Sequence, residues 1–168
     1  MKSIFNAAAA AVIFSISAAQ AAPSSDEAQI RALEQQFATA FGAKDVDAIM
    51  KSYVQDNSLF VFDIGVPRQY VGAAAYRKDW QTFFATFKGP LKFDMSDIAV
   101  TIDGNTAYGH SIQHTTGSDT RGMRQEFVVR VSDVYRKIDG KWLIVQEHVS
   151  VPIDFTTGKP VPDMMSRP

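Results

Sequence analysis

The sequence predicts an α+β domain in which three amphipathic helices wrap a strongly bent antiparallel sheet. Two observations lead to this fold class. Apolar residues recur at helical spacing in the first half of the chain. After Gly89-Pro90, long runs rich in Val, Ile, Tyr and Trp alternate with turn residues, as strands do. The helices therefore come first and the long strands last, and helices gathered on one face of a bent sheet leave an internal pocket.

The first 21 residues are predicted to be a signal peptide outside the fold. Met1-Lys2 gives a positive start, residues 7–19 are apolar, and Ala19-Gln20-Ala21 is a small-residue cleavage pattern. The apolar stretch is too short for a bilayer, which needs about 20 residues. Cleavage after Ala21 leaves residues 22–168 as one periplasmic or secreted domain, free of the membrane, with a Pro-rich tail from about residue 152.

Composition excludes several classes of function. The chain has 17 Lys and Arg against 18 Asp and Glu and no basic run, which argues against nucleic acid or an anionic membrane surface as partner. It has no Cys, and therefore no disulfide framework. A Gly-rich phosphate loop and a nucleophile elbow are both absent from the sequence. We therefore expect no cofactor and no metal.

Helical spacing predicts where the three helices lie. The first runs from Ser24, which forms a capping box with Glu27, to Gly42. The second is shorter and begins at Asp45. The third covers residues 73–87 and ends before Gly89-Pro90.

Residues 59–63 form a short apolar strand, and residues 91–102 and 106–116 form two of the long ones. The last two strands form a hairpin around Asp139-Gly140, the pair that a type I′ turn favours. A plain two-residue loop places Ile138 opposite Lys141, and this pair fixes which residues face each other farther from the turn. In that register Tyr135 faces Ile144, Asp133 faces Gln146 and Val131 faces His148, so that these side chains share one face. A β-bulge would change this arrangement.

Two segments resemble SnoaL-like proteins. They are the stretch from Asp63 to Gly72, with its Gly-Val-Pro-Arg-Gln-Tyr-Val-Gly ending, and the hairpin from Val134 to Pro152, with Val-Tyr-Arg-Lys-Ile-Asp-Gly-Lys-Trp. SnoaL-like proteins belong to the superfamily of nuclear transport factor 2 and ketosteroid isomerase. The likeness covers about residues 26–153 and implies the NTF2-like cone, with an internal pocket. It says little about activity, because this fold hosts isomerases, dehydratases, cyclases, hydrolases and assembly domains.

The resemblance also implies catalytic positions. Asp63 matches the general-base Asp of ketosteroid isomerase, and Asp133 matches its oxyanion-hole Asp, an acid that an apolar site keeps protonated. The third catalytic residue of ketosteroid isomerase is a Tyr, which corresponds to Phe37 in this chain, so that hydroxyl is missing here. From the residues alone, Asp63 is equally a strand-end cap for the next turn. Asp133 is equally a structural partner of Gln146 or His148.

His148 is the third catalytic candidate, since it can orient Asp133 or exchange protons near neutral pH. His110 and His114 share one strand face, but lie about 13 Å apart, too far to bind one metal ion directly. The residues predicted to contact the substrate are Phe37, Tyr53, Trp80, His114, Tyr135 and Gln146.

These observations predict an exported SnoaL-like protein that binds a small apolar molecule. They also predict cofactor-free proton transfer of isomerase, cyclase or dehydratase type, with Asp63 as base and Asp133 as acid. The outer hairpin face, with Val134, Leu143 and Val145, predicts a homodimer. Alternatives are a non-catalytic binding or assembly module and a carrier of hydrophobic metabolites.

Overall fold

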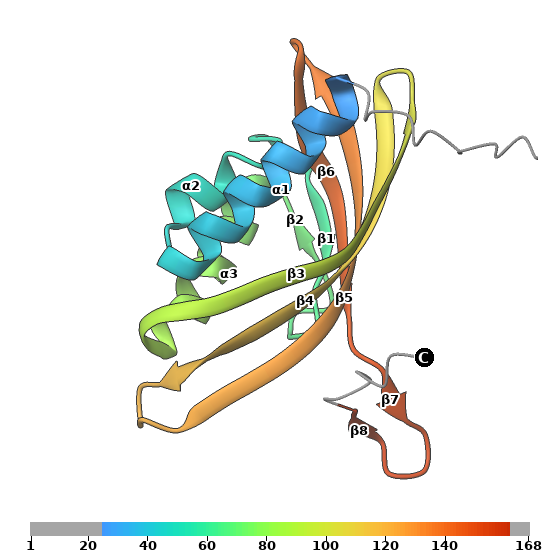
Figure 1. Cartoon of the computed structure of the whole chain (residues 1–168). Coiled ribbons are helices and arrows are strands. Elements are labelled where there is room, and N and C mark those ends of the chain that lie inside the picture. Colours follow the sequence, from blue (N-terminus) through green and yellow to red (C-terminus); the bar gives the residue numbers. More distant parts are fainter. Residues whose placement is uncertain (1–24, 162–168) are drawn as a thin grey trace, which may run out of the picture.

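The computed structural model describes residues 25–161 and confirms the predicted α+β cone (Figure 1). The predicted signal peptide and the Ser24 cap lie outside these residues. In chain order the elements are α1 (Ser25–Ala43), α2 (Val46–Met50), β1 (Phe60–Phe62), β2 (Tyr70–Val71), α3 (Ala73–Ala85), β3 (Phe87–Asp103), β4 (Thr106–Asp119), β5 (Arg124–Ile138), β6 (Lys141–Ser150), β7 (Ile153–Asp154) and β8 (Lys159–Pro160).

The sheet is a curved, six-stranded layer in the order β2-β1-β6-β5-β4-β3. All neighbouring pairs are antiparallel except β1 and β6, which run parallel. The three helices lie on the concave side of this sheet (Figure 1). The parallel pairing places Asp63, directly after β1, beside the last residues of β6, so two segments far apart in sequence meet at the pocket.

The β5–β6 hairpin follows the predicted register only near its turn. Asp139 and Gly140 both have positive φ, as a type I′ turn requires, and Ile138 pairs with Lys141. Tyr135 pairs with Ile144, as predicted, but a bulge at Val145 then shifts β6 by one residue. Beyond it Asp133 pairs with Glu147 and Val131 with Val149. Because side chains alternate with period two, one extra residue exchanges the two faces of β6 beyond this point.

Local chemistry sets the helix boundaries. Asp45 caps α2 by accepting a hydrogen bond from the Ala48 N–H. The third helix ends at Ala85, earlier than predicted, because Phe87 already pairs with Asp119 of β4. Gly89-Pro90 falls inside β3, where the pairing of β3 with β4 is interrupted between Lys88 and Lys92.

The core lies between the helices and the concave face of the sheet. Its largest fully buried side chains include Tyr53, Tyr76, Ile30, Ile49 and Leu59. After β6 the chain leaves the body as the small exposed β7–β8 hairpin (Figure 1). Within residues 25–161, no helix combines the length and the apolar character needed to cross a membrane.

Candidate active site

A pocket of about 240 Å³ opens between α3, α1 and the concave face of the sheet. Its wall is mostly aromatic and aliphatic, and the aromatic side chains are Phe37, Phe41, Tyr70, Tyr76, Trp80, Phe83 and Phe127. Three carboxylic acids also line it, Asp63, Asp79 and Glu147. Among the lining residues there is no Lys, Arg or His. An apolar cavity with a few convergent polar groups is typical of a small-molecule site.

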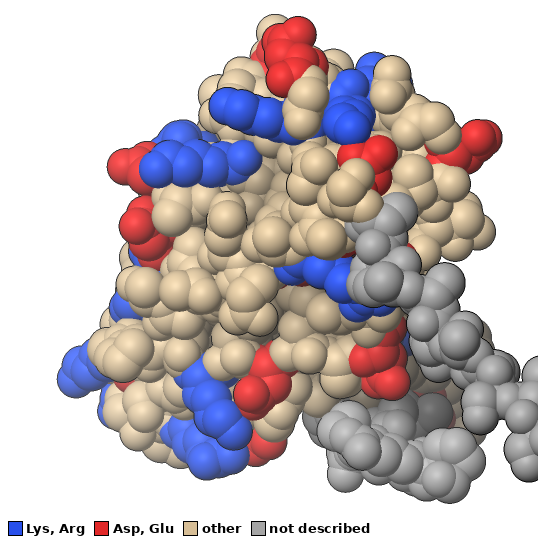
Figure 2. Space-filling model, turned by 45° about the horizontal axis from the view of Figure 1, so that its top comes forward, with Lys and Arg blue, Asp and Glu red and all other residues tan. Residues whose placement is uncertain are grey.

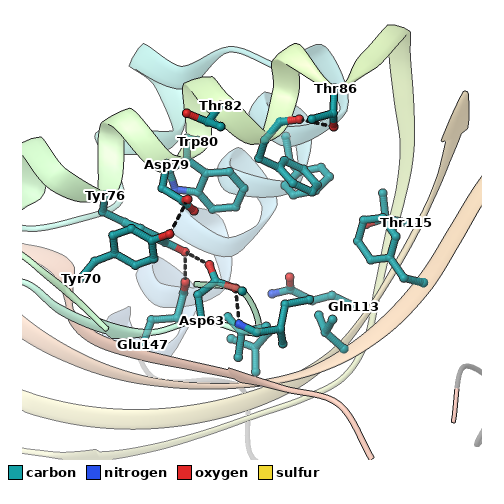
Figure 3. Close-up of a pocket in the computed structure, with 18 of the residues that line it drawn as sticks. Asp63, Tyr70, Tyr76, Asp79, Trp80, Thr82, Thr86, Gln113, Thr115 and Glu147 are labelled. Atoms are coloured by element: carbon teal, nitrogen blue, oxygen red, sulfur yellow. Dashed lines mark hydrogen bonds between the residues drawn. The ribbon is translucent and has the colours of Figure 1, made fainter. Parts of the chain in front are cut away.

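Asp63 lies half-buried at one side of this pocket. Its Oδ1 accepts a hydrogen bond from the Ile64 N–H at 2.6 Å, and its Oδ2 lies 3.4 Å from the Tyr76 hydroxyl (Figure 3). Burial raises the pKa of Asp63, and the charge of Asp79 adds to this, while the two hydrogen bonds oppose it. Asp79 itself accepts a hydrogen bond from the Tyr70 hydroxyl.

Glu147 is the most enclosed acid in the pocket wall, with 4% of its surface exposed. Its Oε1 accepts a hydrogen bond from the Tyr76 hydroxyl at 2.5 Å, and its Oε2 accepts one from the Tyr53 hydroxyl at 2.7 Å. Burial raises the pKa of Glu147 to about 7, against the lowering effect of the two hydroxyls. The Tyr76 hydroxyl therefore joins Asp63 to Glu147, which is the pair of dashed lines at the centre of Figure 3.

A second group of acids lies behind Glu147. Asp133 pairs with Glu147 across β5 and β6 and is 4% exposed. The Tyr135 hydroxyl donates to Glu34 Oε1 at 2.8 Å and lies 3.4 Å from Asp133 Oδ2. Burial, followed by the charges of Glu147 and Glu34, raises the pKa of Asp133 well above its usual range. Burial also raises the pKa of Glu34. With no basic side chain in this group, burial favours the protonated forms of these acids, and Asp133 Oδ1 has no hydrogen-bond partner among the described residues.

The comparisons with known proteins agree with this architecture. The family model described as SnoaL-like domain matches residues 30–154. The chain belongs to the SnoaL-like domain family. A comparison with curated proteins gives no match.

Solved structures show the same fold. An NTF2-like protein of unknown function from Pseudomonas putida is 27% identical with a TM-score of 0.74, covering 83% of this chain and 95% of that one. A nuclear transport factor 2-like superfamily protein from Salmonella enterica serovar Typhimurium is 18% identical with a TM-score of 0.69, covering 80% and 96%. A ketosteroid isomerase-like protein from Erwinia carotovora atroseptica is 20% identical with a TM-score of 0.64, covering 75% and 95%.

The predicted site residues of this SnoaL-like protein fall into three groups. Asp63, Phe37 and Trp80 line the pocket. Tyr53, Asp133 and Tyr135 are buried next to it and take part in the hydrogen bonds among the buried acids described above. His114, Gln146 and His148 are not among the lining residues.

The predicted shared face of Asp133, Gln146 and His148 is wrong, because of the bulge at Val145. Gln146 and His148 are exposed on the outer face of the sheet, where the His148 ring lies beside Phe62. His114 is also displaced from the pocket, since its neighbours Gln113 and Thr115 take the inward positions of β4. Its Nε2 lies 2.9 Å from Glu126 Oε1 instead. No contact connects His148 to Asp133, and its predicted catalytic role has no geometric support.

Sequence reasoning missed three buried members of the site, Glu147, Tyr76 and Glu34. A register without a bulge puts Glu147 on the outer face of the hairpin, beside Leu143 and Val145. Tyr76 stands at helical spacing with Trp80, a pattern typical of ordinary core packing. Glu34 carried a usable signal, since it stands four residues after Ile30 on the buried stripe of α1. An acid at such a position needs a buried partner, and Tyr135 provides it.

Phe37 has no hydroxyl and takes part in aromatic packing. The Phe37 ring packs against Phe41, Tyr53, Trp80 and Phe93, with ring centroids 5.9–6.3 Å apart. The hydroxyl that faces the two pocket acids comes from Tyr76 of α3. Among residues 25–161, no group of three or more His, Cys, Asp or Glu is placed to hold a metal ion.

Proposed function

We propose that this protein binds a small, uncharged, apolar molecule in its pocket and catalyses cofactor-free proton transfer on it. Asp63 is the base, and Glu147 acting through Tyr76 is the acid. The observation that carries this proposal is the Asp63–Tyr76–Glu147 connection inside an apolar pocket. Two carboxyls with raised pKa values joined by one hydroxyl can hold one proton and one charge between them at neutral pH.

The lining favours an uncharged ligand. All three titratable acids of the wall carry negative charge when ionised, and no basic side chain of the wall opposes them. An anion such as a carboxylate or a phosphate would be repelled at close range in a poorly solvated site. This acidic character is local, because the whole chain has a net charge of −1 and the face in Figure 2 shows Lys, Arg, Asp and Glu interspersed in small groups.

The proton steps balance within these residues. Ionised Asp63 removes a proton from the carbon next to the ligand's carbonyl, and the electron pair moves to the carbonyl oxygen. That oxygen takes the proton of the Tyr76 hydroxyl, which takes the proton of Glu147 in turn. Asp63 then returns a proton to the same carbon, which gives hydrogen exchange, or, where a double bond next to that carbon makes the intermediate a dienol, to the far carbon of the dienol, which gives isomerisation. The carbonyl re-forms as the oxygen returns its proton to Tyr76 and Tyr76 returns one to Glu147. An apolar site strengthens such hydrogen bonds to a developing oxyanion. Asp133 does not line the pocket, and its role in this proposal is to support Glu147, its partner across β5 and β6.

A test is the exchange of α-hydrogens for deuterium in D₂O, followed by NMR on a panel of apolar ketones and lactones. We expect Asp63→Asn to abolish enzyme-dependent exchange, a fall of about 10²-fold or more, with Tm within a degree or two of wild type. The matched control is Asp103→Asn, which removes an exposed acid from the β3–β4 turn. It should keep wild-type exchange.

Two results would contradict the proposal. A large loss of stability in Asp63→Asn would show that Asp63 is structural. Ligands that bind and stabilise the protein without any exchange would favour the alternative, a non-catalytic binding module. Native mass spectrometry for a co-purified neutral molecule would then identify what it carries.

A further inference from the structure

Strand β4 presents a polar stripe where the sheet faces the core. Its inward residues include Ser111, Gln113 and Thr115, which are all buried. Gln113 and Thr115 also line the pocket. An inward-facing strand normally buries apolar side chains, and polar groups are retained there when a partner satisfies them.

Gln113 is only partly satisfied by such partners. It is 8% exposed, and its amide makes one hydrogen bond among the described residues, from Nε2 to Ser111 Oγ at 3.4 Å, near the upper limit for such a bond. An amide can donate two hydrogen bonds and accept two. Most of that capacity is unused in a side chain that lies against the pocket (Figure 3).

This amide lies across the sheet from the acids. Glu147 is on β6, Asp63 follows β1 next to it, and Gln113 is on β4, with β5 between β6 and β4. Gln113 pairs with Val129 of β5 and Glu147 pairs with Asp133, so the two positions lie two strand spacings apart across the sheet, about 10 Å, and four residues apart along it, about 13 Å. Between the two polar positions the pocket wall is apolar, including Val129 of β5 and Val149 of β6. The wall therefore offers polar contacts on two sides of an apolar centre.

We propose that Gln113 forms a second polar subsite, which binds a hydroxyl or carbonyl oxygen at the far end of a neutral ligand. The inference rests on the proposed function, because the first oxygen of the same ligand lies at Tyr76 and Glu147. A neutral amide suits a hydroxyl, to which it can donate or from which it can accept, and a carbonyl, to which it can donate. The substrate class is a compact apolar skeleton with oxygen functions at both ends.

The test compares two rigid ketones of one skeleton, 2-decalone and decalin-2,6-dione, by calorimetric titration. We expect the dione to bind wild type about tenfold more tightly, the effect of one added hydrogen bond. Gln113→Leu should remove this preference and leave the Kd of 2-decalone within about twofold. The matched control Gln146→Leu changes the same residue type on the exposed face of β6 and should keep the preference.

The failures are distinguishable. Equal affinity of wild type for both ketones, or a preference that survives Gln113→Leu, overturns the subsite and leaves the proposed function in place. If neither ketone binds wild type, the result counts against the proposed function. The Tm values measured without ligand then show whether Gln113 is held for a ligand or is structural. A buried amide held for a ligand predicts a higher Tm in Gln113→Leu, since its unmet hydrogen bonds disappear. A lower Tm would mark Gln113 as structural and overturn the subsite.

Discussion

Glu147 lies at the centre of the buried hydrogen bonds of the site. Both of its oxygens accept hydrogen bonds from buried tyrosines, and Asp133 is its partner across the strands. No cation compensates it within the described part of this cluster, so ionisation of Glu147 places a charge among other buried acids. The folded state therefore favours the protonated form more than the unfolded chain does, and the pKa of Glu147 rises from 4.5 to about 7.

A raised acid pKa makes stability depend on pH in a defined direction. The folded chain binds more protons than the unfolded chain between pH 4.5 and about 7, so stability is full below 4.5 and falls as pH rises through about 7. From Glu147 alone we expect a loss on the order of 3 kcal/mol between pH 5 and 8. Glu147→Gln, which imitates the protonated acid, should be more stable than wild type at pH 8 and similar at pH 5.

Urea unfolding at several pH values measures this effect. The acids with lowered pKa values, Asp26, Asp56, Asp119 and Glu126, titrate below this range. Asp63, Asp133 and Glu34 have raised pKa values and add slopes of the same sign, so the contribution of Glu147 is the difference between wild type and Glu147→Gln. Asp103→Asn, an exposed acid, should keep the wild-type slope. A Glu147→Gln protein with that same slope would show that Glu147 ionises freely in the folded state, and the acid of the proposed mechanism would be lost.

The hairpin shows how far a strand can be predicted from its sequence. The Asp139-Gly140 turn and the pairs near it were predictable, because turn chemistry and alternation are local. The bulge at Val145 was not, because the sequence carries no Gly there to indicate it and the extra residue is decided by packing against β1 and the helices. The fold was therefore predictable, and so was the position of Asp63 in the pocket wall. The acid opposite Asp133 was not.

The first helix is held to the hairpin by one acid in its first turn. Asp26 Oδ1 accepts hydrogen bonds from Lys137 Nζ at 2.6 Å and from Trp142 Nε1 at 3.1 Å. These bonds, Lys137 first, lower the pKa of Asp26. The stabilisation is therefore present at neutral pH and is lost as pH falls through the lowered pKa.

Asp26→Ala tests this anchor. We expect Tm to fall by a few degrees, because the Trp142 N–H and Lys137 lose their acceptor, and amide exchange in the first turns of α1 to become faster. Asp94→Ala is the control, since its pair with Lys92 is exposed at both ends and should contribute almost nothing. Equal Tm changes in the two variants would show that α1 is held by its apolar stripe alone.

At the scale of the whole molecule, the helices cover the concave face of the sheet, and no element within residues 25–161 covers the convex face. The helices and the pocket occupy the concave side (Figure 1). On the other side, Val134 of β5 pairs with Tyr108 of β4, which is 60% exposed, and Leu143 is half-buried nearby. Val145, which was predicted on this face, packs against the core instead. An apolar area on a sheet with no covering layer is typical of a protein–protein interface. The predicted homodimer would place it between two copies.

We expect light scattering at micromolar concentration to give twice the mass of one chain for the protein without its predicted signal peptide. Val134→Glu places a charge at the centre of the convex face and should give the mass of a single chain, because an unpaired charge in a dimer interface costs several kcal/mol. Met123→Glu adds the same charge at the exposed β4–β5 turn and should leave the mass unchanged. A wild-type protein with the mass of one chain would refute the dimer, and a dimer that survives Val134→Glu would move the interface to another surface.

Because the pocket opens on the concave side, Val134→Glu should also retain ligand binding, which separates assembly from the site.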